Sequence, residues 1–219
     1  DFGSIDRTFT PVNGQELITV PDGVAHFLEH KMFEKIDHDA FDLFGELGAD
    51  SNAFTSFTQT SYLFSTTQHV HESLDVLLDF VEQPYFSSQT VQKEKGIIGQ
   101  EIKMYDDDPN WRLYFGMLGN LYPHDPMHID IAGTVESIDQ ITADTLYSTY
   151  DSFYQPANMN LFIVGNVDPA ETMEWIADNQ KQKHFNQVTI PEVQFELNDE
   201  TGQDVIPFRT LEMDVTRPK

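Results

Sequence analysis

Three residues near the start of the chain have the types and spacing needed to bind a metal ion and activate water. His26 and His30 stand four residues apart, and Glu29 lies three residues after His26. On a helix this spacing places them on one face. Two neutral imidazoles can then bind one zinc ion while the Glu29 carboxylate lies beside the water that the metal activates. The alternative is an ordinary helix whose histidines are surface or core residues, because a chain with eight histidines can form such a pair by chance.

A long helix predicted over about residues 88–105 offers a third ligand. Glu94, Ile97, Ile98 and Glu101 recur at the spacing of a stripe that faces a protein core. A carboxylate on such a stripe is costly unless it is paired or bound to a metal. Glu94 and Glu101 are two turns apart and face the same way, so one could bind the metal and the other hydrogen-bond a ligand histidine. The alternative is that both lie at the solvent edge of the stripe and pair with neighbouring lysines.

The remaining chain alternates between helical and strand patterns. Residues 51–67 are rich in Thr, Phe and Tyr and nearly free of charge, which predicts a hairpin with its turn near Gln59. The apolar run 160–165 predicts a buried strand. Apolar spacing and capping residues predict helices over about 22–34, 39–47, 70–81, 88–105, 111–121, 135–138, 143–154 and 169–179. Groups of strands with helices between them indicate an α+β fold, a mainly antiparallel sheet with helices packed on one face.

The two ends of the chain have weaker patterns. Residues 3–20 predict one or two short strands, and Asp22 is a suitable N-cap for the helix that carries the histidines. Gly48 is expected just after the end of the second helix. Beyond Lys183, alternating apolar residues and several prolines predict edge strands and a connector that leads out of the domain.

Composition excludes several classes of function. Net charge is −25, from 12 Lys and Arg against 37 Asp and Glu. Such a surface repels phosphate groups and anionic membranes, so we expect no nucleic-acid and no membrane partner. The chain has no cysteine, which rules out disulfides, cysteine nucleophiles and thiolate zinc sites. We expect a cytoplasmic protein, since no apolar run could span a bilayer and the first residues do not resemble a signal peptide.

Five blocks of sequence resemble, in the same order, the inverzincin zinc peptidases of the insulinase (pitrilysin) type, which include the mitochondrial processing peptidase. They cover roughly residues 1–180, and their details (HKMFEK and MYDDDPNWR) look closest to the YmfH-like bacterial branch. Five blocks in order are much more specific than one motif. The blocks are GVAHFLEHKMF (23–33), GADSNAFT (48–55), EKGIIGQE (94–101), GTVESI (133–138) and YQPANMNLFIVG (154–165).

The resemblance assigns roles to individual residues. It implies that His26, His30 and Glu101 bind zinc, that Glu29 is the general base and that Glu94 is a carboxylate outside the ligand set.

The resemblance also implies a binding site for a peptide substrate. A second group of residues matches the family's edge strand, which pairs with the substrate backbone. An ordinary covered edge is the alternative reading of that strand. The group consists of Asn52, Ala53, Phe54 and Thr55.

The resemblance therefore implies a zinc-dependent endopeptidase acting on peptides or small unfolded protein segments, with water activated by Glu29. Family members have two similar halves that close around the substrate. Residues 1–183 would be the zinc-binding catalytic half-domain, and residues 184–219 edge strands and a connector toward a second half. We expect a second half-domain or a paralogous subunit as partner, in a homo- or heterodimer, and weak or no activity of the isolated half. The alternative is a non-catalytic zinc-binding or scaffolding partner within an insulinase-type heteromer.

Overall fold

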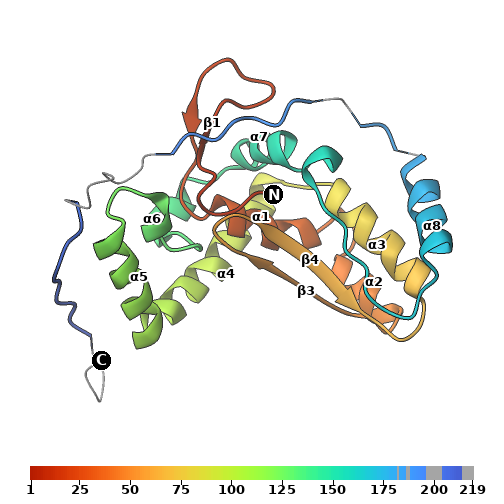
Figure 1. Ribbon diagram of the computed structural model, residues 1–219, viewed down its shortest axis with the longest axis horizontal. Coiled ribbons are helices and arrows are strands. Elements are labelled where there is room, and N and C mark those ends of the chain that lie inside the picture. The colour runs from red at the N-terminus through yellow and green to blue at the C-terminus, as the bar shows by residue number, and fades with distance from the viewer. Residues whose placement is uncertain (182, 186–187, 196–203, 214–219) are drawn as a thin grey trace.

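A computed structural model describes residues 1–181, 183–185, 188–195 and 204–213, and helices predominate among them (Figure 1). Within this part of the chain, no helix is both long and apolar enough to cross a membrane. The elements are β1 (Thr8–Phe9), β2 (Ile18–Thr19), α1 (Val24–Phe33), α2 (Ala40–Glu46), β3 (Asp50–Thr55), β4 (Thr60–Ser65), α3 (Val70–Glu82), α4 (Ser88–Asp106), α5 (Pro109–Leu121), η1 (Pro126–His128), α6 (Val135–Asp139), α7 (Ala143–Phe153), η2 (Pro156–Asn158) and α8 (Pro169–Lys181).

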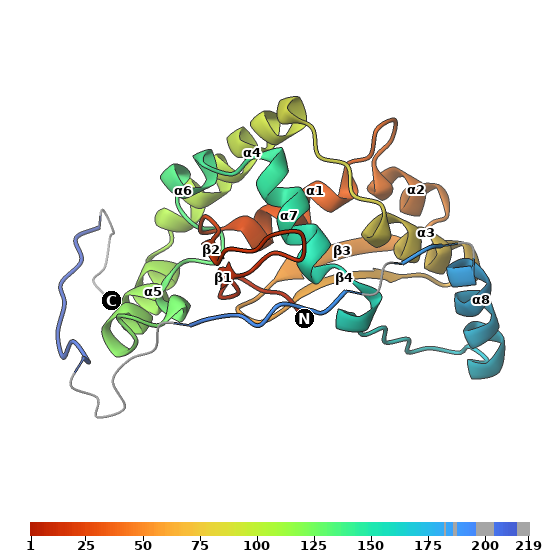
Figure 2. The ribbon, with the colours of Figure 1, turned by 90° about the horizontal axis from the view of Figure 1, so that it is seen from above.

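The β-structure consists of two antiparallel hairpins. β1 pairs with β2, and β3 pairs with β4 in a register that sets Asn52 opposite Leu63. The predicted antiparallel hairpin and its turn near Gln59 are thus confirmed. The single mainly antiparallel sheet is not found, because the described strands form two separate two-stranded sheets. α1 and α2 lie on one side of the β3–β4 hairpin (Figure 2).

The apolar run 160–165 does not form the predicted buried strand. It has no regular secondary structure, and the residues Phe162 and Val164 are 85% and 98% exposed. This run and β4 both line a cavity of about 1100 Å³. An apolar run becomes a buried strand only where another strand supplies backbone hydrogen bonds and a packing surface. No described strand pairs with this run, so the prediction was wrong here.

The predicted edge strands beyond Lys183 are also absent from the described residues there, 183–185, 188–195 and 204–213. Two backbone bonds hold this part to the body: Gln194 N donates to Thr8 O (2.8 Å), and Ile206 N donates to Asn120 O (2.8 Å). Single bonds of this kind attach a segment without forming a ladder. Leu197 and Val215, which belong to the predicted alternation, lie outside the described residues.

α1 begins at a glycine rather than at the predicted aspartate cap. Gly23 is the N-cap with a φ of 87°, and a Cβ there would lie 2.3 Å from Ala132 O. Only glycine tolerates both the left-handed backbone and this close approach. Asp22 instead forms an ion pair with Arg7 (2.7 Å). Nine of the ten residues of α1 are buried, so the helix runs through the centre of the core.

α4 begins and α2 ends as their sequences predict. Ser87 caps α4 in a reciprocal capping box with Thr90, which satisfies amide groups at the helix start. Gly48 follows α2 with a φ of 69°, the left-handed conformation common after a helix end. Ile98 and Ile102 bury one face of α4 in the core. That face is the one that carries the candidate ligands.

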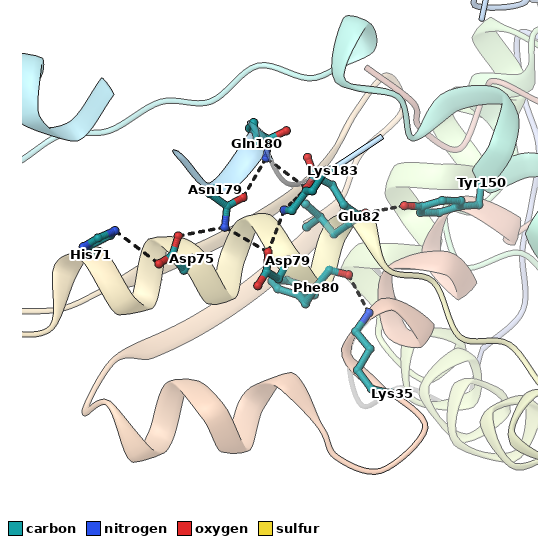
Figure 3. Close-up of polar contacts among 11 residues, drawn as sticks. Lys35, His71, Asp75, Asp79, Phe80, Glu82, Tyr150, Asn179, Gln180 and Lys183 are labelled. Carbon is teal, nitrogen blue, oxygen red and sulfur yellow. Dashed lines mark hydrogen bonds and ion pairs between the residues drawn. The ribbon is translucent and has the colours of Figure 1, made fainter. Parts of the chain in front are cut away.

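α8 is attached to α3 through polar side chains (Figure 3). Asn179 Nδ2 donates to Asp75 Oδ1 (2.9 Å) and Asp79 Oδ1 (3.2 Å). Lys183 forms ion pairs with Asp79 and Glu82. These contacts join α8 and the residue Lys183 beyond it to α3, and they involve none of the candidate metal ligands.

Candidate metal centre

α1 and α4 bring His26, His30 and Glu101 together. His26 Nε2 lies 3.7 Å from Glu101 Oε1, and His30 Nε2 lies 3.4 Å from Glu101 Oε2. A donor atom from each residue lies within 4.8 Å of the others. Ligands at the usual zinc distances sit about 3.3 Å apart at the corners of a tetrahedron. The two separations from Glu101 are close to this value, and imidazole nitrogen and carboxylate oxygen are donor types that bind zinc.

Glu94 contacts the opposite side of the His30 ring. His30 Nδ1 lies 3.0 Å from Glu94 Oε1, and the Glu94 side chain is 12% exposed. Because a carboxylate accepts, Nδ1 carries the hydrogen and Nε2 is left to face Glu101. The contact thus fixes the tautomer a metal ligand needs, as the sequence predicts for one of the two glutamates.

Glu29 lies in the same region and is 9% exposed. Burial raises the pKa of its carboxyl, and a hydrogen bond from Thr55 partly opposes the rise. Thr55 Oγ1 donates to Glu29 Oε2 over 2.7 Å. A carboxylate with a raised pKa is a better proton acceptor, which suits a general base.

The charges around the histidines favour a cation. Burial lowers the pKa of His26 to about 4, so its ring is neutral, and its Nδ1 is buried without a hydrogen-bond partner among the described residues. Burial also lowers the pKa of His30, but hydrogen bonds to Glu101 and Glu94 outweigh it and raise the value to about 9. The bond to His30 lowers the pKa of Glu101 to about 2, against burial. The carboxylates around the histidines therefore favour a positive charge at this point.

Tyr105 is a site residue that the sequence reasoning missed. Its hydroxyl donates to Glu101 Oε1 over 2.8 Å. It lies four residues after Glu101 on α4, so the one-turn spacing from a candidate ligand is the signal that could have identified it.

The four predicted substrate-binding residues are not all in one place. Asn52 and Ala53 line a cavity of about 500 Å³ together with Glu29, His30 and Glu94. The structure thus sets these two beside the candidate metal centre.

The other two members of that group have different surroundings. Phe54 lines the larger cavity beside β4, and Thr55 contacts Glu29. Successive strand residues point to opposite faces, so Phe54 lies on the face of β3 opposite to Ala53 and Thr55.

Two family models match this chain. Residues 20–134 match the family model described as insulinase (peptidase family M16), and residues 140–215 match the model described as peptidase M16 inactive domain. The chain is 53% identical over 218 residues to the uncharacterized zinc protease YmfH of Bacillus subtilis (strain 168), covering 100% of this chain and 50% of that protein. It is 30% identical over 151 residues to the uncharacterized zinc protease YmxG of the same strain, covering 67% of this chain and 37% of that protein.

Solved structures give the same result. The crystal structure described as a putative M16-like peptidase from Alicyclobacillus acidocaldarius has a TM-score of 0.83 and 44% identity, over 90% of this chain and 46% of that one. The chain spans about half the length, or less, of these relatives. The family predicted from the five sequence blocks is confirmed: the chain belongs to the insulinase family of peptidases, family M16.

Proposed function

We propose that this chain carries the catalytic site of a zinc-dependent endopeptidase that acts on peptides or small unfolded protein segments. The observation that carries the proposal is the convergence of two imidazole nitrogens and one carboxylate at separations of 3.4 and 3.7 Å. Relatives that cover the whole chain or two thirds of it are named zinc proteases, which supports the same metal and reaction class.

In this proposal His26, His30 and Glu101 hold the zinc ion, and Glu94 orients His30 from behind. A bound zinc ion would lower the pKa of water toward about 7 and polarise the substrate carbonyl. Glu29 accepts the proton of the attacking water and passes it to the leaving amine. Its burial raises its proton affinity, which favours the first of these transfers.

We propose that the substrate lies extended along β3. β3 pairs with β4 along one edge, and no other described strand pairs with it. A peptide can add to such an edge through main-chain hydrogen bonds. Asn52 and Ala53 lie on this strand and border the cavity that also contains Glu29 and His30. The four residues predicted to bind substrate would then contribute through the strand backbone, with Thr55 also orienting the base.

We also propose the division of the chain made from its sequence. Residues 1–183 form the catalytic half-domain, of the processing-peptidase-like type, and residues 184–219 lead toward a second half-domain or a paralogous subunit. The support is that relatives extend to about twice the length of this chain. A substrate chamber made of two halves is the reason why we expect the isolated half to be weakly active or inactive.

A second function is a non-catalytic zinc-binding or scaffolding role in a heteromer. The specific observation in its favour is the match of residues 140–215 to a model described as an inactive domain. The metal residues lie outside that range, which makes this the weaker candidate.

The proposal is tested by metal content and titration. The chain, purified without chelator, is analysed for bound metal and then titrated with Zn²⁺ by calorimetry. We expect one zinc per chain and loss of binding in His26→Ala and His30→Ala, with His124→Ala, an exposed histidine, as the matched control. Absence of zinc from the purified chain together with no binding on titration would overturn the proposal.

Cleavage is tested separately from metal binding. A peptide library is incubated with the chain and with Glu29→Gln, which is expected to bind zinc as the unmodified chain does. Any cleavage should disappear in Glu29→Gln, and cleavage that persists in this variant would show that Glu29 is not the base. Zinc binding without any cleavage, even with added second-half protein, would favour the scaffolding role.

A further inference from the structure

A group of three side chains, Tyr105, Trp111 and Asp130, extends from Glu101 through α5 to the segment at residue 130. Tyr105, one turn further along α4, donates its hydroxyl to Glu101 Oε1 (2.8 Å). The ring of Tyr105 stacks on the ring of Trp111 from α5, with centroids 4.6 Å apart and planes at 17°. Trp111 Nε1 in turn donates to Asp130 Oδ2. The ring that carries this hydroxyl therefore packs on a residue of α5, and that residue is bound in turn by Asp130.

The same group is connected to the start of α1. Asp130 Oδ1 accepts from the backbone N of Ala132 (3.0 Å). Ala132 lies directly against Gly23, at a distance that leaves no room for a Cβ. Gly23 begins α1 and stands three residues before His26. Contacts thus run from Glu101 on α4, through the loop at 130–133, to the helix that carries the histidines.

The hydrogen bond from Tyr105 acts on the orientation of the Glu101 carboxylate. A glutamate side chain has three rotatable bonds, so an unrestrained carboxylate samples many orientations. Tyr105 engages Oε1, and the other oxygen, Oε2, then faces His30 Nε2 at 3.4 Å. The Tyr105 hydroxyl is the donor of this bond, because an ionised carboxylate can only accept.

We propose that Tyr105, held in place by Trp111 and Asp130, is a positioning residue that sets the orientation of Glu101 as a metal ligand. This inference rests on the proposed zinc site. The competing explanation is that Tyr105 only packs α5 against α4. The two differ in what the hydroxyl does, because packing depends on the ring and ligand orientation depends on the oxygen.

The test compares Tyr105→Phe with the unmodified chain, using Co²⁺ as a spectroscopic substitute for zinc. The variant keeps the ring and its stack on Trp111 and removes only the hydroxyl. Tyr114→Phe is the matched control, since Tyr114 is 43% exposed on α5 and has the same chemistry. We expect Tyr105→Phe to bind Co²⁺ about 10- to 100-fold more weakly, with an altered visible spectrum, while Tyr114→Phe behaves as the unmodified chain.

Thermal unfolding of the metal-free proteins separates orientation from packing. We expect metal-free Tyr105→Phe to unfold at nearly the same temperature as the unmodified chain. If the unmodified chain binds Co²⁺ and Tyr105→Phe binds it equally well with the same spectrum, the positioning role is overturned and the zinc site stands. If the unmodified chain binds neither Co²⁺ nor Zn²⁺, the zinc site is overturned and this inference with it.

Discussion

Thr55 Oγ1 donates a hydrogen bond to Glu29 Oε2 over 2.7 Å, and this bond joins strand β3 to helix α1. The sequence predicts that Thr55 binds substrate through the edge of its strand. Its side chain contacts the carboxylate that is the candidate general base. The strand proposed to hold the peptide therefore also orients the group proposed to activate water, so the two functions share one element.

Replacing Thr55 by valine should raise the pKa of Glu29. The hydrogen bond from Thr55 stabilises the ionised carboxylate and lowers its pKa, in opposition to burial. The measurement is an NMR titration of the Glu29 side-chain carboxyl in the metal-free chain. Thr55→Ser keeps the hydroxyl and is the control, with an expected pKa close to that of the unmodified chain. An unchanged pKa in Thr55→Val would mean that the bond is not formed in solution.

Replacing Glu94 by alanine should weaken zinc binding by about 10- to 100-fold, the usual effect of losing a partner that orients a ligand histidine. The reason is the 3.0 Å contact between Glu94 Oε1 and His30 Nδ1. Gln100→Ala, at an exposed position of the same helix, should leave the affinity unchanged. Calorimetric titration with Zn²⁺ measures both variants. Equal zinc affinities for Glu94→Ala and Gln100→Ala would show that Glu94 does not orient His30. The alternative reading, in which Glu94 lies at the solvent edge of the apolar stripe of α4, would then hold.

Two glycine-to-alanine changes should have opposite effects on stability. Gly23→Ala places a Cβ 2.3 Å from Ala132 O at a φ of 87°, so we expect a loss of about 1–3 kcal/mol or more in the free energy of unfolding. Gly96 lies within α4. Among the described residues, no atom other than those of its chain neighbours and its own helix backbone lies within 4 Å of the point that a Cβ would occupy. Gly96→Ala should therefore gain about 0.5–1 kcal/mol from helix propensity. Urea denaturation measures both, and a Gly23→Ala protein as stable as the unmodified chain would contradict the close approach.

The contribution of Asp6 to the free energy of unfolding should fall as pH rises. Burial raises the pKa of Asp6 from 3.8 to about 6, against the hydrogen bond it accepts from Gly3 N. Between these two values the folded chain binds more protons than the unfolded chain. The contribution of Asp6 to stability is therefore present below pH 3.8 and lost as pH rises through about 6.

Asp6→Asn removes this proton equilibrium and isolates its effect. From pH 4 to pH 7 the unmodified chain should lose about 1–2 kcal/mol more stability than the variant, after allowance for partial exposure of the side chain. The free energy of unfolding in urea at the two pH values gives the difference. Parallel pH profiles for the two proteins would show that Asp6 titrates normally.

Most of the helices, the β3–β4 hairpin and the candidate metal residues could be predicted from the order of amino acids. These features depend on local spacing: a period near four residues sets His26, Glu29 and His30 on one helix, and two turns separate Glu94 from Glu101. Such relationships hold whatever the helix packs against. The resemblance to the family predicted in addition that residues from two helices far apart in the chain bind the same metal ion. Local spacing cannot predict such a long-range relationship.

The contacts that these residues make could be known only from the folded chain. Folding set Glu101 against both histidine Nε2 atoms and Glu94 against His30 Nδ1, and it placed the Tyr105 hydroxyl on Glu101. It also left the apolar run 160–165 without a partner among the described strands. The physical reason is the same in each case. Burial, strand pairing and side-chain orientation depend on groups distant in sequence, and local periodicity contains no information about where those groups lie.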